Sequence, residues 1–288
     1  MKTLAEYQKI AREEGWALPH FNISSLDQLW GIALAAREAQ SPVLVGTSEG
    51  EREYLGMRQV VALIRSLREE GVPLFLNADH CKSAESAIKA LEAGYDSVHI
   101  DLSKESYEVN MRGTQQVVVA AKKKSPEVQV EGELGYLATD SSMVYEKEIA
   151  IPEDSYTNVE QAVEFVEKTG VHRLAPAVGT IHGIAVNKPR IRFDLISQLN
   201  AVVGDRVALV LHGGSGTQDK DLVQAIQEGI SNVHISTELR VAYREALDAS
   251  LQNSPKELAP YRYLMPARVA VQQAVAKKIA LFGVQGKQ

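Results

Sequence analysis

Short apolar segments rich in β-branched residues alternate with longer amphipathic segments along almost the whole chain. We expect eight strands, at residues 16–23, 42–48, 73–79, 97–103, 128–135, 173–180, 207–213 and 232–238. Continuous apolar segments of this kind are typical of parallel strands that are buried on both faces. Eight strand–helix units predict an α/β fold that closes into a (β/α)8 (TIM) barrel. A dinucleotide-binding fold is disfavoured, because the first strand leads into Ser24-Ser25-Leu26-Asp27 and not into a glycine-rich turn.

The segments between these strands have helical periodicity. We expect helices at residues 26–40, 60–70, 84–93, 109–124, 158–168, 193–202 and 219–228. Three of these segments start at a typical N-cap residue and end at a glycine, namely 83–94, 158–170 and 219–229. Two segments are additional to a minimal barrel. The first is a long loop at 136–157, of a size often found in functional lids, and the second is a C-terminal extension whose last helix spans 267–282. We therefore expect residues 1–288 to form a single barrel domain with these two additions.

Charge and cysteine content exclude several classes of protein. The 31 Lys and Arg residues against 37 Asp and Glu residues give a net charge of −6, which argues against a broad surface for nucleic acid or for an anionic membrane. The single cysteine, Cys81, excludes a disulfide framework and a cysteine-rich metal site. Neither a secretory signal nor a long apolar span is visible, so we expect a cytoplasmic protein.

Histidines gather at the predicted carboxyl ends of the strands, where barrels of this class carry their active sites. The five in this group are His80, His99, His182, His212 and His234, whereas we expect His20 and His172 to be structural. Three of the five, His80, His182 and His212, come from different strands, as a catalytic Zn²⁺ with an open position requires. Co²⁺, Fe²⁺ or Mn²⁺ also suits imidazole ligands, and a monovalent cation is a further expected cofactor.

Carboxylates accompany the histidines. Asp101 or Glu133 could be a fourth metal ligand, or an acceptor that fixes a histidine tautomer. Strand alternation places Glu131 and Glu133 on one face, and a buried pair of acids requires a nearby cation. Asp79 precedes His80 directly, and consecutive side chains of a strand diverge, so His80 turns toward a metal only if the strand ends there.

Two turns suited to anions follow the last two strands. Gly213-Gly214-Ser215-Gly216 precedes one expected helix, and Ser236-Thr237 opens the next. Barrels often bind phosphate at this place, on backbone N–H groups at a helix N-terminus. The two turns therefore predict a phosphate site beside the histidines.

In combination and order, these segments resemble the class II, metal-dependent fructose- and tagatose-bisphosphate aldolases. The resemblance extends over residues 4–283 and is carried by LNADH at 76–80, SVHID at 97–101, VEGELG at 130–135, AVGTIHG at 177–183, LVLHGGSG at 209–216, STELR at 236–240 and YLMPAR at 263–268. It implies a glycolytic lyase that cleaves a ketose 1,6-bisphosphate reversibly into dihydroxyacetone phosphate and glyceraldehyde 3-phosphate. A Zn²⁺ on three neutral imidazoles would stabilise the enediolate oxygen as a Lewis acid, and no Schiff-base lysine would be needed.

The resemblance also implies a role for each group of residues. The zinc ligands are His80, His182 and His212, with Asp101 and Glu133 as residues that approach the metal, and Asp79 as the catalytic acid/base. The residues that match the dihydroxyacetone phosphate site are Gly183, Gly213, Gly214, Ser215, His234, Ile235, Ser236 and Thr237. Arg268 matches an arginine that meets the second phosphate, often from a neighbouring subunit, which predicts a homodimer or homotetramer.

The chain departs from the usual family pattern at several positions. His234 stands where the family usually has an asparagine that contacts the substrate, and His99 stands where methionine is commoner. The long loop lacks the usual Gly-Gly-acid start, so the acid that exchanges the C3 proton is one of Asp140, Glu146 and Glu148. The sequence leaves open whether fructose or tagatose bisphosphate is preferred.

Two other functions agree with the same residues. A zinc-dependent barrel hydrolase of a phosphorylated substrate would use the same histidines, with Asp79 as its base. A phosphosugar-binding protein without catalysis would account for His234 and for the altered loop. Release of triose phosphate, of inorganic phosphate or of neither product separates the three functions.

Overall fold

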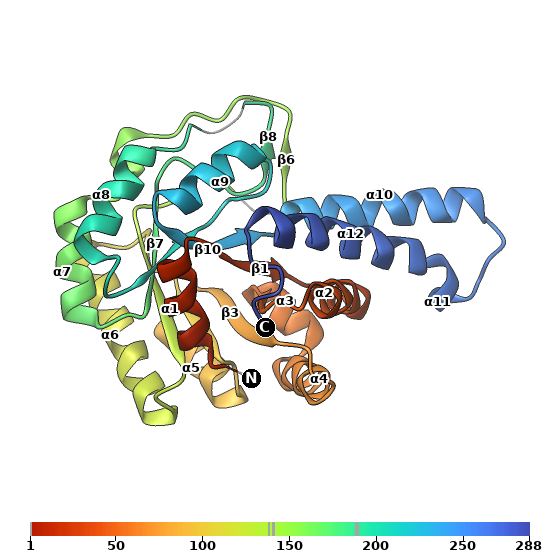
Figure 1. The fold of residues 1–288 in the computed structure, drawn as a ribbon, viewed down its shortest axis with the longest axis horizontal. Coiled ribbons are helices and arrows are strands. Elements are labelled where there is room, and N and C mark those ends of the chain that lie inside the picture. The colour runs from red at the N-terminus through yellow and green to blue at the C-terminus, as the bar shows by residue number, and fades with distance from the viewer. Residues whose placement is uncertain (1, 138, 140–141, 188–189) are drawn as a thin grey trace.

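Eight parallel strands close into a barrel, which confirms the expected (β/α)8 fold (Figure 1). The computed structural model describes residues 2–137, 139, 142–187 and 190–288. The barrel strands are β1 (Leu18–Asn22), β2 (Val43–Thr47), β3 (Leu74–Cys81), β4 (Ser97–Ile100), β5 (Gln129–Leu134), β7 (Arg173–Pro176), β9 (Ala208–Leu211) and β10 (Ile230–Ile235). Each overlaps one of the expected segments, and pairing of β1 with β10 closes the barrel.

Helices surround the barrel, most of them at the expected positions. They are α1 (Leu4–Glu14), α2 (Leu26–Ala39), α3 (Glu49–Leu55), α4 (Met57–Glu69), α5 (Ala84–Ala93), α6 (Tyr107–Lys124), α7 (Val159–Thr169), α8 (Phe193–Val203) and α9 (Asp219–Gln227). The seven expected helices correspond to α2 and α4–α9, whereas α1 and α3 are additional. Ser83 and Asn158 cap α5 and α7 as expected, but α9 begins after Gln218 and not after Asp219.

The additional helix α1 covers the end of the barrel at which the strands begin. Tyr7 of α1 packs edge-on against Phe75, the second residue of β3, with 5.8 Å between the ring centroids. The opposite end of the barrel is therefore the one open to the loops that follow the strands.

The lumen of the barrel is polar, whereas the hydrophobic core lies between the strands and the helices. Core side chains such as Ile32, Phe165 and Leu199 come from the surrounding helices and are fully buried. The polar residues in the lumen include His20, Asn77, Ser97, His99, Glu131, Arg173, Asn232 and His234, each at most 5% exposed. Barrels of this class usually fill their lumen with branched aliphatic side chains. Buried polar groups need partners, so these residues must bond to one another or to a ligand.

The long segment after β5 contains secondary structure of its own. β6 (Val144–Tyr145) pairs in parallel with β8 (Ile184–Ala185), which lies in the loop after β7, and the 3₁₀ turn η1 spans Glu153–Ser155. The Thr157 amide donates to the carbonyl oxygen of Ala177, 3.0 Å away. The loops after β5 and β7 are thus joined to each other above the barrel.

The expected C-terminal extension is an antiparallel pair of helices. α10 (Thr237–Asn253) and α12 (Met265–Leu281) lie side by side and project from the barrel, joined by a turn that contains α11 (Pro260–Tyr263) (Figure 1). α12 also packs against α2, which fixes the base of the extension. Within the described part of the chain, no helix has both the length and the apolar character that a membrane span requires.

Candidate active site

Asp79 and His80 face the same cavity although they are consecutive residues of β3. The pairing of β3 with β4 shifts register between Ala78 and Cys81, and His80 adopts a left-handed backbone with φ = 46°. An irregularity of this kind re-aims a side chain next to an active site. The strand continues to Cys81, so the expectation that it must end at His80 was wrong. The left-handed backbone at a residue with a side chain costs on the order of 1–2 kcal/mol.

Most of the predicted site residues line one small cavity at the carboxyl ends of the strands. Its volume is about 20 Å³, enough for an ion or a water molecule. The lining residues are Asn22, Asp79, His80, His182, Gly183, His212, Gly213, Ser215, His234, Ser236 and Thr237. Three predicted metal ligands, the predicted acid/base and parts of both anion-suited turns therefore converge, and Asn22 joins them without having been predicted.

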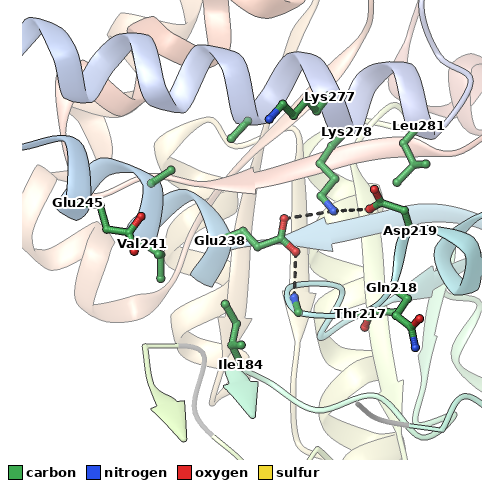
Figure 2. A pocket seen from close by; sticks show the side chains of 13 residues that line it. Ile184, Thr217, Gln218, Asp219, Glu238, Val241, Glu245, Lys277, Lys278 and Leu281 are labelled. Carbon is green, nitrogen blue, oxygen red and sulfur yellow. Dashed lines mark hydrogen bonds and ion pairs between the residues drawn. The ribbon is translucent and has the colours of Figure 1, made fainter. Parts of the chain in front are cut away.

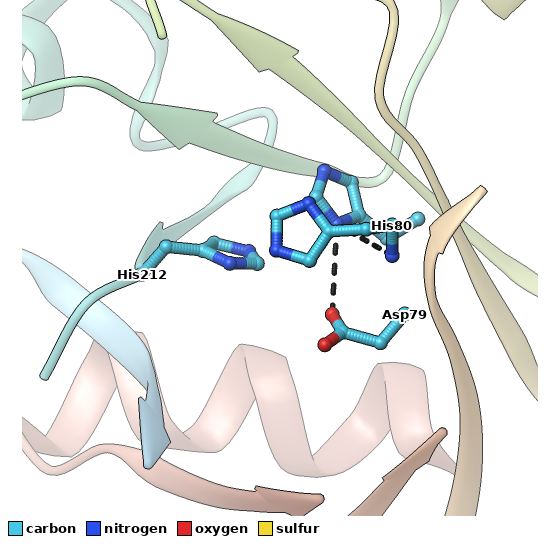
Figure 3. Close-up of side chains that lie close together, drawn as sticks. Asp79, His80 and His212 are labelled. Carbon is cyan, nitrogen blue, oxygen red and sulfur yellow. Dashed lines mark hydrogen bonds and ion pairs between the residues drawn. The ribbon is translucent and has the colours of Figure 1, made fainter. Parts of the chain in front are cut away.

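The three predicted ligand rings lie close together. The ring centroid of His80 lies 4.9 Å from that of His182 and 4.8 Å from that of His212, and the last two are 5.8 Å apart. Figure 3 shows His80 and His212 together with Asp79. One possible ligand atom from each of Asp79, His80, His99 and His212 lies within 4.8 Å of those of the other three. His99 thus enters the group, whereas His182 approaches it from the loop after β7.

Carboxylates orient two of the imidazoles from behind the cavity. Asp101 Oδ2 lies 2.7 Å from His80 Nδ1, and Glu131 Oε1 lies 2.7 Å from His212 Nε2. Each carboxylate accepts the N–H of its partner, so His80 Nε2 and His212 Nδ1 are left for a metal. Glu133 Oε2 lies 3.8 Å from His80 Nδ1, and His80, Asp101 and Glu133 bring ligand atoms within 4.8 Å of one another. The contact of Asp101 with His80 Nδ1 fits the expected role of an acceptor that fixes the tautomer, whereas the role of either carboxylate as a fourth metal ligand stays a prediction.

The charges of the site suit metal binding and proton transfer. Burial lowers the pKa of His182, and the neighbouring His80 and His212 lower it further, so the ring is held as the neutral form that binds metal. Burial raises the pKa of Asp79, but the charge of His80 and the neighbouring His234 and His99 together outweigh burial and hold this pKa well below its usual range. Asp79 is therefore ionised, as a general base must be.

One oxygen of Asp79 is held and the other is free. Asn22 Nδ2 donates to Asp79 Oδ2 at 3.0 Å and also to Glu51 Oε2 at 3.1 Å. Asp79 Oδ1 is buried and has no hydrogen-bond partner within the described residues. Its nearest imidazole nitrogens are His234 Nδ1 at 3.5 Å and His99 Nδ1 at 3.6 Å. Oδ1 is therefore the oxygen that can accept a proton from a bound molecule.

His20 lies against the histidine cluster, contrary to the expectation that it stays apart from it, although it is not among the residues that line the cavity. Its ring stacks on that of His234, with centroids 3.5 Å and planes 5° apart. Gly46 leaves room for the ring, since a Cβ at this glycine would lie 2.1 Å from His20 Cε1. Burial lowers the pKa of His20 to about 3, so the ring is neutral. The strand pattern places His20 and Asn22 on one face of β1, but it does not show that His234 lies beside them.

His172, in contrast, has the structural role expected of it. Its Nδ1 accepts a hydrogen bond from the backbone N–H of Val130, 3.0 Å away. This contact ties the residue that precedes β7 to the start of β5, at the end of the barrel remote from the cavity.

The two anion-suited turns are joined by hydrogen bonds. Ser215 Oγ accepts from the backbone N–H groups of Ser236 at 3.1 Å and of Glu238 at 3.3 Å. Gly213 requires its glycine, because its φ is 68° and a Cβ there would lie 2.3 Å from the carbonyl oxygen of Ile181. Ser215 thus positions the start of α10 next to the cavity.

A larger cavity of about 510 Å³ lies between α9, α10 and α12 (Figure 2). Glu238 accepts the N–H of Gly216 at 2.9 Å, and its other oxygen lies 3.1 Å from Nζ of Lys278 on α12. The same Nζ lies 3.1 Å from Asp219 Oδ1. These contacts fasten the glycine turn to the C-terminal helix, and the histidine cluster does not line this cavity.

Three predicted binding residues lie outside the small cavity. Gly214 and the fully buried Ile235 are packed behind it, since a Cβ at Gly214 would lie 2.9 Å from Ile235 Cδ1. Arg268 lies on α12, and its guanidinium is 2.9 Å from Asp27 Oδ1 of α2. Within one chain, therefore, Arg268 does not reach the cavity.

Thr139, in the loop after β5, reaches the site. Thr139 Oγ1 donates to the carbonyl oxygen of His182 at 2.7 Å, next to the cavity. Glu146 and Glu148 are exposed, and Asp140 lies outside the described residues. The acid that exchanges the C3 proton stays a prediction.

The chain is similar to known proteins over its whole length. Residues 2–287 match the sequence model of the family described as "Fructose-bisphosphate aldolase class-II". A probable fructose-bisphosphate aldolase of Bacillus subtilis is 35% identical over 285 residues (98% of this chain and 97% of that protein), and a fructose-bisphosphate aldolase of Staphylococcus aureus is 34% identical over 281 residues (96% and 95%). The crystal structure of the YdjI aldolase from Escherichia coli K12 superposes with a TM-score of 0.81 at 28% identity, covering 99% of this chain and 98% of that one. Fructose-bisphosphate aldolases are lyases, and by these matches the chain belongs to the class II fructose-bisphosphate aldolase family.

Proposed function

We propose that the chain acts in the cytoplasm and cleaves fructose 1,6-bisphosphate or tagatose 1,6-bisphosphate to dihydroxyacetone phosphate and glyceraldehyde 3-phosphate. The observation that carries the proposal is the convergence of Asp79, His80 and His212 on one cavity that also borders two anion-suited turns. Membership of the family supports the reaction class.

The donor set fits a divalent metal, for which we propose Zn²⁺. Imidazoles from β3 and from the loops after β7 and β9 would leave an open position. Glu133 Oε2 is buried without a hydrogen-bond partner among the described residues, and a nearby cation compensates such an oxygen. When bound, Zn²⁺ would supply a Lewis acid beside the carbonyl oxygen of the substrate.

Side chains and backbone N–H groups of the chain would transfer the proton and bind the phosphate. In cleavage, Asp79 Oδ1 takes the proton of the C4 hydroxyl, and in condensation it returns this proton to the aldehyde oxygen. Asn22 holds the other carboxylate oxygen, which fixes the direction of Oδ1. The turns at 213–216 and 236–237 would hold the phosphate of dihydroxyacetone phosphate.

Product analysis tests this function directly. Metal-loaded protein is incubated with each bisphosphate, and triose phosphate and inorganic phosphate are measured separately. Triose phosphate release is the expected result, and its relative rate identifies the preferred C4 epimer. Inorganic phosphate without triose phosphate would identify a hydrolase, and binding without either product would identify a phosphosugar-binding protein.

We also propose that the chain forms a homodimer or homotetramer in which Arg268 reaches the site of a neighbouring copy. The support is the apolar surface of the projecting extension, where Leu258 is 85% and Tyr261 is 66% exposed. Sedimentation velocity measures the assembly state, and a monomer at micromolar concentration would contradict the proposal.

A further inference from the structure

A buried arginine lies inside the barrel lumen, below the small cavity. Arg173 is the first residue of β7 and is 0% exposed. Its guanidinium donates to Asn77 Oδ1 at 2.9 Å, to Ser97 Oγ at 2.8 Å and to Asn232 Oδ1 at 3.1 Å. These three partners come from β3, β4 and β10, so side chains from several sides of the barrel fix the direction of the guanidinium.

The same guanidinium faces the carboxylate behind a predicted metal ligand. Arg173 Nη2 lies 3.2 Å from Glu131 Oε2, and the other oxygen, Glu131 Oε1, lies 2.7 Å from His212 Nε2. Glu131 is 0% exposed, and a carboxylate without water around it is costly unless a cation accompanies it. A guanidinium always carries its charge, so Arg173 compensates Glu131 before any metal is present.

We infer that Arg173 is a positioning residue of the metal site, because it anchors Glu131, which in turn fixes the tautomer and direction of His212 with Nδ1 toward the cavity. This inference rests on the metal site of the proposed function. Arg173 is absent from the lining of the cavity, so it acts through Glu131 and not by touching substrate or metal.

The arginine is tested by the metal affinity of the full-length protein. Arg173→Met should weaken Zn²⁺ binding about 10–100-fold in a chelator competition, the loss typical when a partner behind a ligand is removed. Arg12→Met is the matched control, since Arg12 is half-buried on α1 and donates to the carbonyl oxygen of Gly204 at 2.9 Å, outside the lumen. Its Zn²⁺ affinity should equal that of the unchanged protein.

The path through Glu131 is tested by a double-mutant cycle. If Arg173 acts through Glu131, the neutral pair Arg173→Met/Glu131→Gln binds Zn²⁺ as weakly as Glu131→Gln alone, whereas independent effects would add. Additive losses would overturn the inference. The double variant also avoids leaving a lone buried charge, and replacing both partners of a buried pair is often tolerated.

A conservative variant covers the case in which Arg173→Met does not fold. Arg173→Lys keeps the charge but loses the fork that holds Asn77, Ser97 and Glu131 together, so a several-fold loss of Zn²⁺ affinity is expected. Unchanged affinity in a folded Arg173→Met or Arg173→Lys variant would refute the inference while leaving the proposed function intact. If the unchanged protein itself binds no divalent metal, the proposed metal site fails, and this inference fails with it.

Discussion

Replacing Asp79 by asparagine removes the proposed base and changes little else in the cavity. The side chain is only 5% exposed, and asparagine has the same size and shape. Its amide oxygen can still accept the hydrogen bond that Asn22 Nδ2 now donates at 3.0 Å. The position of the side chain should therefore be kept, whereas its ability to take a proton from the C4 hydroxyl is lost.

The size of the effect follows from the composition of the cavity. General base catalysis contributes about 10²–10⁴-fold, or about 3–5 kcal/mol at 1.36 kcal/mol for each factor of ten. Among the described residues that line the cavity, Asp79 is the only carboxylate, so no neighbouring acid can replace it. We therefore expect kcat to fall by roughly 10³–10⁴-fold, with a small change in KM.

A coupled assay of triose phosphate release measures kcat and KM, and elemental analysis measures the bound metal. Asp79→Asn should retain its metal and its thermal stability while it loses turnover. Asp194→Asn is a suitable control, because Asp194 lies at the surface of α8 and pairs only with Arg192 among the described residues. A kcat within about threefold of the unchanged protein, with metal content preserved, would show that another group is the base.

Three further predictions concern the metal, the glycine turn and pH. His212→Ala should lose metal and triose phosphate release together, and a variant that keeps both contradicts the ligand assignment. Gly213→Ala should lower the melting temperature and turnover, because its φ of 68° and the 2.3 Å approach to Ile181 O leave no place for a methyl group; an unchanged melting curve speaks against this packing. Burial lowers the pKa of His172 from 6.5 to about 4, so the folded protein favours the neutral ring. The free energy of unfolding therefore keeps its full value above pH 6.5 and decreases as the pH falls toward 4, by at most about 3 kcal/mol. Urea unfolding between pH 4 and 7 should show a flatter profile for His172→Gln, and a profile as steep as that of the unchanged protein excludes this histidine as the cause.

The sequence alone predicted the barrel because continuous apolar strands and intervening amphipathic helices repeat eight times. The sequence also predicted that His80, His182 and His212 lie at one rim of the barrel, since the carboxyl ends of parallel strands meet there. His20 escaped notice because its partner, His234, is 214 residues away and becomes a neighbour only when β1 pairs with β10. Closure of the barrel is a non-local event that local patterns do not contain.

Two features of β3 and β7 had no local signature. The register shift at His80 depends on how β3 pairs with β4, so alternation alone could not place Asp79 and His80 on one side. The buried acids were correctly expected to need a cation, but that cation was assigned to a metal alone. The structure adds Arg173, a charged residue at a strand start whose direction the sequence does not reveal.

The left-handed backbone of His80 has a consequence for directed evolution of this protein. Glycine adopts such a φ without strain, so His80→Gly should relieve on the order of 1 kcal/mol of backbone strain while it deletes an imidazole of the cavity. A library selected for heat resistance alone should therefore enrich glycine at this position and shed its metal, whereas a library selected also for turnover should keep histidine. Comparing the residues found at position 80 after the two selections would show whether the protein loses stability at this residue in order to keep its activity.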